Sequence, residues 1–239
     1  MRATLIRPEG LDALHTDDGC VVLAKPSGLL VHNAAYAGPR EVTLTELARA
    51  RFGEDLVPVH RLDRGTSGVI VFARGSVWAA RWQEALDGAE KRYVALVRGA
   101  LREATCVDHA FADEDGVRRP ARTGLVPLAS RGEPRCGLVL ARPYTGRTHQ
   151  VRRHLKHLSL PVIGDANYGK GALNREYASR VGLSRLALHA LSLTLTHPGT
   201  GARSSFEAPL PEDLARPLAV IFGEAALRAA LATARAAAV

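Results

Sequence analysis

Five short apolar runs limit the kinds of fold open to this chain. Each is rich in valine, leucine or isoleucine and is bounded by glycine, proline or charge, which is typical of a buried strand. None approaches the roughly eighteen apolar residues that a membrane-spanning helix needs, so no membrane partner is expected. The predicted strands are Cys20–Ala24, Gly68–Ala73, Arg92–Val97, Gly137–Arg142 and Leu186–Leu195.

Helices are predicted between and after these strands. A capping box at Thr43-x-x-Glu46 starts the first, and a four-residue repeat of Trp78, Trp82 and Leu86 marks the second. Pro161 stops the third. The predicted helices run from Thr43 to about Gly53, over Val77–Leu86, over Thr148–Leu158 and over the alanine-rich stretch Phe222–Val239.

The mixed order of strands and helices favours an α+β fold around a largely antiparallel sheet. We expect residues 1–16 to be an extension joining the core, residues 17–210 a catalytic domain and residues 211–239 a helical tail. The segment Gly99–Arg135 looks less regular and contains a turn-rich patch at Asp113–Gly116.

Charge points to a polyanionic partner. The net charge is +8, and Arg142–Arg185 holds nine basic and two acidic residues, or +7. Such a local basic surface is typical of a protein that binds phosphate backbones. Three scattered cysteines form neither a disulfide framework nor a zinc knuckle, and we read them as small buried residues. Met1–Glu9 lacks a signal-peptide pattern, so the cytoplasm is expected.

One segment places a carboxylate between two arginines. In His60–Gly68, Asp63 stands beside Arg61 and Arg64 in a loop that leads into an apolar strand. Two guanidiniums near a carboxylate favour its ionised form, and such a group is a usable nucleophile. An aspartate in a salt-bridged turn is the structural alternative.

Two further segments offer candidate residues. Tyr93, in Lys91-Arg92-Tyr93, could stack on a base or move a proton, or be a half-buried strand residue. In Thr145–His154, a glycine turn precedes a helix, so a phosphate backbone could be followed by Arg147, Arg153, Lys156 and His157. Arg152 could point inward to a buried carboxylate. The histidines there lack the His-Glu-x-x-His spacing of zinc proteases, and no metal is expected.

These segments together resemble the large-subunit-rRNA pseudouridine synthase A family over about residues 10 to 210. Six short motifs in the family's order are far more specific than any one of them. The motifs are Ala24–His32, His60–Gly68, Lys91–Tyr93, Gly146–His154, Gly164–Gly169, and Leu188-His189 followed by Thr196–Pro198.

The resemblance implies a mixed sheet in two lobes with a central RNA-binding cleft. It implies that Asp63 is the catalytic aspartate, that Arg152 pairs with it, and that Tyr93 packs on the target base and moves a proton. Arg61 would fill the space of the flipped-out base. The expected substrate-binding residues are His60, Arg61, Arg64, Thr66, Arg147, His149, Gln150, Arg153 and Lys156.

The resemblance also implies the reaction, the isomerisation of an RNA uridine to pseudouridine, which requires no cofactor or metal. Within the family, Arg152–Ser159 and Leu173–Leu188 resemble members that modify the tRNA uridine at position 65, in the T stem. No S4-like RNA-binding domain fits before Asp17. We expect a monomer. An rRNA-directed synthase, a non-catalytic RNA-binding protein and a metal-dependent hydrolase using the histidines are the alternatives.

Overall fold

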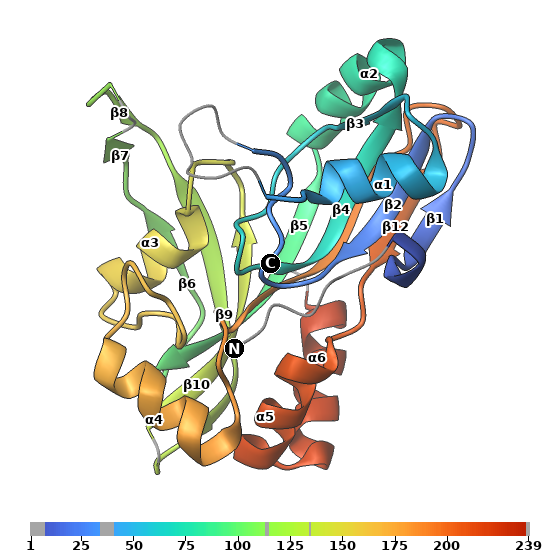
Figure 1. Cartoon of the computed structure of the whole chain (residues 1–239). Coiled ribbons are helices and arrows are strands. Elements are labelled where there is room, and N and C mark those ends of the chain that lie inside the picture. The colour runs from blue at the N-terminus through green and yellow to red at the C-terminus, as the bar shows by residue number, and fades with distance from the viewer. Residues whose placement is uncertain (1–7, 34–40, 113–114, 134, 238–239) are drawn as a thin grey trace. The chain divides into compact units, whose positions relative to one another are not determined.

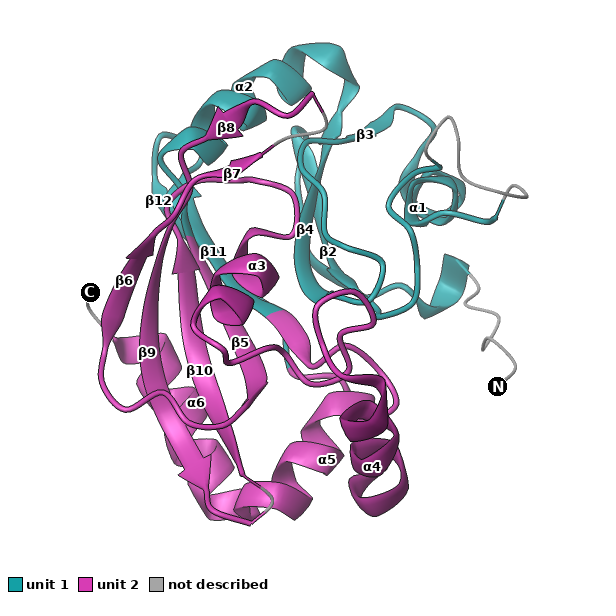
Figure 2. Ribbon diagram, turned by 90° about the vertical axis from the view of Figure 1, so that its left-hand side faces the viewer, with its two compact units in different colours: residues 1–90, 190–209 teal, residues 91–189, 210–239 magenta. Residues whose placement is uncertain are grey.

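The computed structural model describes residues 8–33, 41–112, 115–133 and 135–237 (Figure 1). Among these residues it contains six α-helices and a mostly antiparallel arrangement of strands, which confirms the α+β class. The chain forms two compact units, drawn in different colours in Figure 2. Residues 1–90 and 190–209 make the first unit, and residues 91–189 and 210–239 make the second.

Antiparallel strands form the centre of the first unit. β1 (Ala13–Thr16) pairs with β2 (Cys20–Lys25), and β2 pairs along its whole length with β4 (Ser67–Arg74). β3 (Leu56–Pro58) pairs with the end of β4. A short 3-10 turn at Pro8–Gly10 precedes β1. The two predicted strands of this region are therefore confirmed, and β1 and β3 were too short and polar to be found from sequence.

β11 (Leu188–Thr196) begins in the second unit, ends in the first, and pairs there with β12 (Arg203–Glu207). The alternation of strand residues gives this unit its core. Alternate residues of β2, β4 and β11 face α2 (Gly75–Asp87), and Trp82 is completely buried among them. Trp78 is partly buried against the same cluster. Both tryptophans therefore contribute to the hydrophobic core of this unit.

Helix α1 (Leu44–Phe52) shows the predicted start and stop. The Thr43 side chain accepts a hydrogen bond from the Glu46 backbone N–H, and the Glu46 carboxylate accepts one from the Thr43 backbone N–H. The helix ends at Gly53. A glycine is also required at the entry to β4, where Gly68 has φ +122°. A Cβ atom there would lie 2.1 Å from the Ala190 carbonyl oxygen, so only glycine allows β4 this close approach.

The second unit has its own antiparallel strands. β5 (Glu90–Arg98) pairs with β10 (Cys136–Pro143), β10 with β9 (Arg122–Arg131), and β9 with β6 (Thr105–Asp108). Two short strands, at Phe111–Ala112 (β7) and Arg118–Arg119 (β8), form a separate hairpin.

The expectation of an irregular Gly99–Arg135 was therefore wrong. β6 and much of β9 are half exposed, so their sequences mix polar and apolar residues and show no apolar run. Tertiary pairing decides their conformation. Of the predicted turn patch Asp113–Gly116, only residues 115–116 are described.

Helices flank these strands. α3 (Gln150–His157) contacts β9 and β10 on one face, and α6 (Glu224–Ala236) lies against β9 on the other (Figures 1 and 2). α6 confirms the predicted helix in the alanine-rich stretch. α5 (Glu212–Phe222) lies within the helical tail expected over residues 211–239, whereas α4 (Gly171–Val181) was not predicted. α4 buries only Tyr177, which leaves no apolar stripe to read.

Arg92 anchors the C-terminal helix to β5. Its guanidinium donates to the Ala234 carbonyl at 2.9 Å, to that of Ala237 at 3.1 Å, and to that of Arg235. A cation on β5 therefore donates to backbone carbonyls at the end of α6. No single described helix is long and apolar enough to cross a membrane; α5 and α6 meet that test only as a pair, bent by 115°.

Candidate functional site

The loop of Asp63 is a tight turn at the entrance to β4. The Thr66 backbone N–H donates to the Asp63 carbonyl at 3.0 Å, and Gly68 then starts the buried run of β4. The Asp63 side chain is half-buried. A carboxylate on a turn tied to a buried strand has a defined position while part of it stays open to a ligand.

A buried lysine holds this loop from beneath. Lys25, at the end of β2, is 1% exposed. Its Nζ donates to the carbonyls of Thr66 at 2.8 Å, Pro26 at 2.9 Å and Arg64 at 3.1 Å. An ammonium has three protons, so these three bonds use all of its donors. Lys25 thereby fixes the backbone on the C-terminal side of Asp63.

Residues after Lys25 tie down the same loop. The Ser27 hydroxyl donates to the Gly65 carbonyl at 2.8 Å, and the Gly28 N–H donates to the Arg64 carbonyl at 2.7 Å. Arg64 returns a bond from Nε to the Gly28 carbonyl and forms an ion pair with Glu41 at 2.9 Å. Residues of the motif Ala24–His32 thus hold the loop of the motif His60–Gly68 in place.

The remaining predicted residues of this loop differ in exposure. Arg61 is exposed, whereas Thr66 is 1% exposed. The His60 Nε2 accepts the Val71 backbone N–H at 3.1 Å, which fixes the ring against β4. The structure therefore brings His60, Arg61, Asp63, Arg64 and Thr66 together in one anchored loop, as the motif predicts.

Arg152 makes the best-defined ion pair of the second unit. Its Nε donates to Asp165 Oδ2 at 2.7 Å and its Nη2 to Oδ1 at 2.8 Å, and both side chains are buried. Burial alone would raise the pKa of Asp165, but the bonds from Arg152 and from the Tyr168 and Asn167 N–H groups hold it below its usual range. The expected buried carboxylate partner is present, and it is Asp165.

A glycine makes the Asp165 turn possible. Gly164 has φ +81°, and a Cβ atom there would lie 1.8 Å from the Arg185 carbonyl oxygen. Asp165 Oδ1 then accepts from the N–H groups of Asn167 at 2.9 Å and Tyr168 at 3.0 Å. The centre of the Tyr168 ring lies 5.2 Å from the Arg152 guanidinium. The same loop thus supplies Arg152 with a carboxylate partner, Asp165, and an aromatic partner, Tyr168.

The start of α3 is organised by Gln150, which is 4% exposed. Its Oε1 accepts from the Thr145 hydroxyl at 2.6 Å and from the Arg147 N–H at 3.0 Å. Its Nε2 donates to the Arg122 carbonyl at 2.9 Å and to the Thr123 hydroxyl at 3.0 Å. All four hydrogen-bonding positions of the amide are filled by protein. Gln150 therefore fixes the turn before α3, and its contact with substrate stays a prediction.

Other predicted residues of the second unit are more accessible. His149, in left-handed conformation at φ 54°, has Nδ1 3.1 Å from the Tyr168 hydroxyl. Arg147 and Lys156 are exposed, and Arg153 is half-buried. Tyr93 is half-buried in β5, opposite Ala141 of β10. Since Asp63 belongs to the first unit, its pairing with Arg152 and the cleft between two lobes stay predictions.

A cluster in the first unit resembles a metal site by composition. His15, Asp17, Cys20 and His197 place one ligand atom each within 4.8 Å of one another. Burial alone would raise the pKa of Asp17, but the Gly19 N–H, His15, the Cys20 N–H and His197 outweigh it and lower the pKa to about 2.

The tautomer of His197 does not fit a metal, however. Its Nδ1 accepts the N–H groups of Gly199 at 3.1 Å and Thr200 at 3.3 Å. The neutral ring therefore carries its proton on Nε2, which faces Asp17 Oδ2 at 2.9 Å. That nitrogen offers no lone pair to an ion, so the cluster is better described as a set of polar contacts around the Asp17 carboxylate.

Sequence reasoning treated all three cysteines as buried. Cys20 and Cys136 are buried, and burial raises the pKa of both thiols. Cys106 is exposed and accepts a hydrogen bond from Arg122 Nε at 3.3 Å, so that expectation was wrong for this residue. It lies on the half-exposed strand β6, whose polar side sequence patterns did not reveal.

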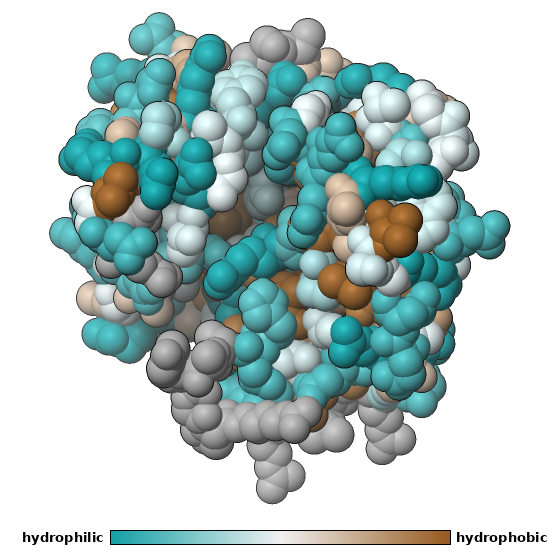
Figure 3. All heavy atoms as spheres, turned by 90° about the horizontal axis from the view of Figure 1, so that it is seen from above, coloured by the Kyte–Doolittle hydropathy of each residue, from teal (hydrophilic) through white to brown (hydrophobic). Residues whose placement is uncertain are grey.

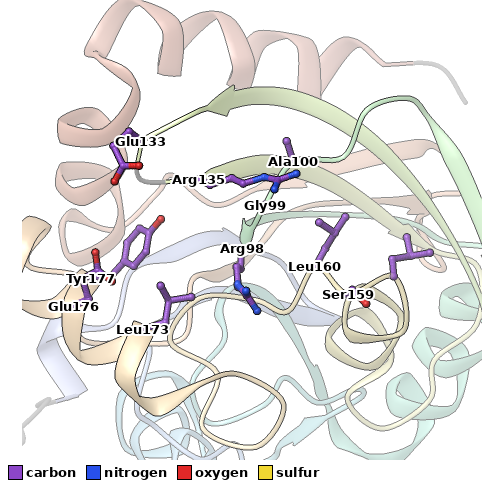
Figure 4. A pocket seen from close by; sticks show the side chains of 11 residues that line it. Arg98, Gly99, Ala100, Glu133, Arg135, Ser159, Leu160, Leu173, Glu176 and Tyr177 are labelled. Atoms are coloured by element: carbon purple, nitrogen blue, oxygen red, sulfur yellow. The ribbon is translucent and has the colours of Figure 1, made fainter.

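One open pocket of about 550 Å³ lies in the second unit (Figure 4). Arg98, Arg135 and Tyr177 are among its lining residues, and none of the predicted site residues is. Its open walls mix polar and apolar residues, whereas a typical small-molecule site is mostly apolar and encloses its ligand. On the face shown in Figure 3, hydrophilic side chains predominate and hydrophobic ones are isolated, so this face shows no broad apolar patch.

Two residues that build the site were missed as site residues. Lys25 follows the apolar run Cys20–Ala24, and a charge at the end of a buried strand is a signal that it is paired inside. Asp165 follows Val162-Ile163-Gly164, a similar signal. Both could have been suspected from sequence, but their partners are set by the fold.

Comparison with known proteins agrees with this site. The family model for RNA pseudouridylate synthase matches residues 19–157. The chain is 37% identical over 224 residues to tRNA pseudouridine synthase C of Salmonella typhimurium, covering 84% of this chain and 86% of that protein. It is 34% identical to the protein of that name from Haemophilus ducreyi, covering 84% of this chain and 92% of the relative.

Solved structures agree as well. Human RNA Pseudouridylate Synthase Domain Containing 1 superposes with a TM-score of 0.73 at 25% identity, covering 98% of both chains. Human RNA Pseudouridylate Synthase Domain Containing 4 gives 0.70 at 26% identity, covering 86% of this chain and 91% of that one. On the extent of these matches, and with Asp63 in its anchored loop, this chain belongs to the RNA pseudouridylate synthase family.

Proposed function

We propose that this RNA pseudouridine synthase acts on tRNA, at the T-stem uridine of position 65, and uses Asp63 as its catalytic carboxylate. The tRNA assignment is supported by the relatives of 34–37% identity, whose names specify tRNA. The position follows from the family resemblance of Arg152–Ser159 and Leu173–Leu188. The alternative substrate is 23S rRNA.

The reaction breaks the N1–C1′ bond of uridine and forms a C5–C1′ bond. The proton at C5 leaves, and N1 gains one, so the product is an isomer and no electrons are exchanged. A paired base cannot reach a carboxylate on the protein surface, so the uridine must leave the stack at a cost of a few kcal/mol. Exposed Arg61, beside Asp63 in the loop, is suited to fill the vacated space.

One observation supports Asp63 above all: the buried ammonium of Lys25 holds its loop through the carbonyls of Arg64 and Thr66. A surface aspartate without a function does not need a loop held by a buried cation. The anchoring leaves the carboxylate half-exposed and fixed, which is what attack on C1′, addition to C6 or removal of the 2′ proton each requires. These three routes stay open.

Arg152 and Tyr93 complete the proposed chemistry. The guanidinium of Arg152 is oriented by Asp165, with bonds of 2.7 and 2.8 Å, and would hold Asp63 charged and in position. Tyr93, on β5, would pack on the target base and move a proton. Arg147, Arg153 and Lys156 would bind the RNA backbone.

The test is Asp63→Asn, with release of tritium from C5 of uridine in a tRNA transcript as the readout. We expect the variant to fold, to bind RNA with wild-type affinity and to release no tritium. Asp87→Asn, an exposed carboxylate at the end of α2, is the matched control and should retain full activity. Tritium release by Asp63→Asn at the wild-type rate would exclude the assignment.

The substrate is tested separately, by mapping pseudouridine in total tRNA and 23S rRNA from cells with and without the gene. Loss of one pseudouridine in the T stem supports the tRNA proposal. Loss confined to 23S rRNA selects the alternative. No change in either RNA contradicts the catalytic reading and favours a protein that binds RNA without modifying it.

A further inference from the structure

Two histidines stack on the surface of the second unit. His109 follows β6, and His157 is the exposed last residue of α3. Their ring centroids are 4.1 Å apart and their planes differ by 24°. We call this pair the histidine stack. Within the described ranges, no protein group hydrogen-bonds to a ring nitrogen of either residue, so the stack presents its nitrogens to an incoming ligand.

Two arginines flank the histidine stack. Arg153 lies one helical turn before His157 on the same face of α3. Its guanidinium sits 3.9 Å from the centre of the Phe111 ring of β7 and donates weakly to the Ala112 carbonyl. Arg118 of β8 is held by a bond to the Ala110 carbonyl at 3.0 Å. The hairpin and the helix thus converge on one basic cluster.

Burial and the local charge both disfavour a proton on His109 in the free protein. Partial burial, then His157, Arg118 and Arg153, hold the pKa of His109 below its ordinary value. The nearby carboxylate of Asp108 acts instead on Arg122. Two stacked imidazoles among guanidiniums are poorly placed to take up protons unless an anion joins them.

A third histidine on the same helix has a different role. His154 is fully buried, with Nδ1 2.7 Å from the Thr123 hydroxyl and Nε2 3.2 Å from the His109 carbonyl. Burial lowers its pKa, and its nitrogens are already used by protein. It supports the position of His109 and does not face a ligand.

We propose that the histidine stack, together with Arg118 and Arg153, binds a phosphate of the RNA backbone and takes up a proton when it does so. The proposal rests on the proposed function, which supplies the RNA. A phosphate beside the two rings provides the missing counter-charge and accepts hydrogen bonds from a protonated imidazole. Protonation and RNA binding then strengthen each other by the same factor.

The sign of the pH dependence follows. Bound phosphate raises the pKa of the stack, so RNA affinity is highest below the free-state pKa and falls as pH rises through the bound-state value. Uptake of one proton changes Kd by up to tenfold per pH unit where the stack titrates. We expect the wild-type Kd to rise about threefold to tenfold between pH 6 and pH 8.

The experiment measures Kd for a full-length tRNA transcript from pH 5.5 to 8 at constant ionic strength, because phosphate contacts also respond to salt. His157→Asn removes one ring of the stack, whereas His157→Lys replaces it with a fixed cation. Arg216→Gln, an exposed charge on α5, is the control for a general loss of positive charge.

We expect His157→Asn to bind weakly with little pH dependence, and His157→Lys to bind tightly even at pH 8. Arg216→Gln should keep the wild-type slope. A wild-type slope in His157→Asn, or a flat wild-type profile, would overturn the proposal. Pseudouridine formation by the wild type is scored separately, so failure of the stack is distinguishable from failure of the proposed function.

Discussion

Replacing Asp165 by asparagine tests how the site positions Arg152. The carboxylate accepts two hydrogen bonds from the guanidinium and two from backbone N–H groups. In asparagine an NH₂ group replaces one of the two carboxylate oxygens. This NH₂ group is a donor, and it would face the N–H donors that now bind the carboxylate. It also removes the buried counter-charge that Asp165 supplies to Arg152, which is 6% exposed.

The cost can be worked from this geometry. Removing one partner of a buried ion pair destabilises a protein by about 3–5 kcal/mol, because the remaining charge stays desolvated. For a chain of this size, each kcal/mol lowers Tm by about 2–4 °C. Asp165→Asn should therefore lower Tm by roughly 6–20 °C.

A second substitution separates charge burial from catalysis. In Arg152→Met/Asp165→Asn the uncompensated charge is gone, so we expect part of the lost Tm to return while tritium release stays abolished. The measurements are thermal unfolding at pH 7 and tritium release at 25 °C. A Tm change under about 2 °C for Asp165→Asn, or a double variant that releases tritium at the wild-type rate, would refute the reasoning.

Lys25→Met should destabilise the fold by about 2–4 kcal/mol, because three carbonyls, that of Thr66 buried, lose the donor they share, and should also lower kcat. Urea unfolding and tritium release check this, and an unchanged kcat would separate Lys25 from the Asp63 loop. Asp17→Asn should cost at most about 2 kcal/mol at pH 7. Since the Asp17 pKa is lowered to about 2, this stabilisation exists above pH 4 and disappears as pH falls toward 2. A gap between wild type and variant that persists at pH 2 would contradict it.

Much of the fold could be read from the sequence, because buried strands and capped helices are local signals. Five strands have sequences apolar enough to be predicted without the structure: β2, β4, β5, β10 and β11. β6, β9 and β12 carry polar residues on an exposed side, and α4 buries a single tyrosine. Their conformation depends on pairing with residues far away in sequence, and a local sequence pattern carries no information about those partners.

The same division holds for the site. The sequence alone identified the Asp63 loop, the Arg152 helix and the family, because ordered motifs preserve residue identity and spacing. Only the tertiary structure decided that Lys25 holds the Asp63 loop, that Asp165 is a partner of Arg152, and that Gln150 is buried in a turn. The physical reason is that hydrogen bonds and ion pairs join atoms by distance in space, and residues 25 and 66 become neighbours only once β2 and β4 have paired.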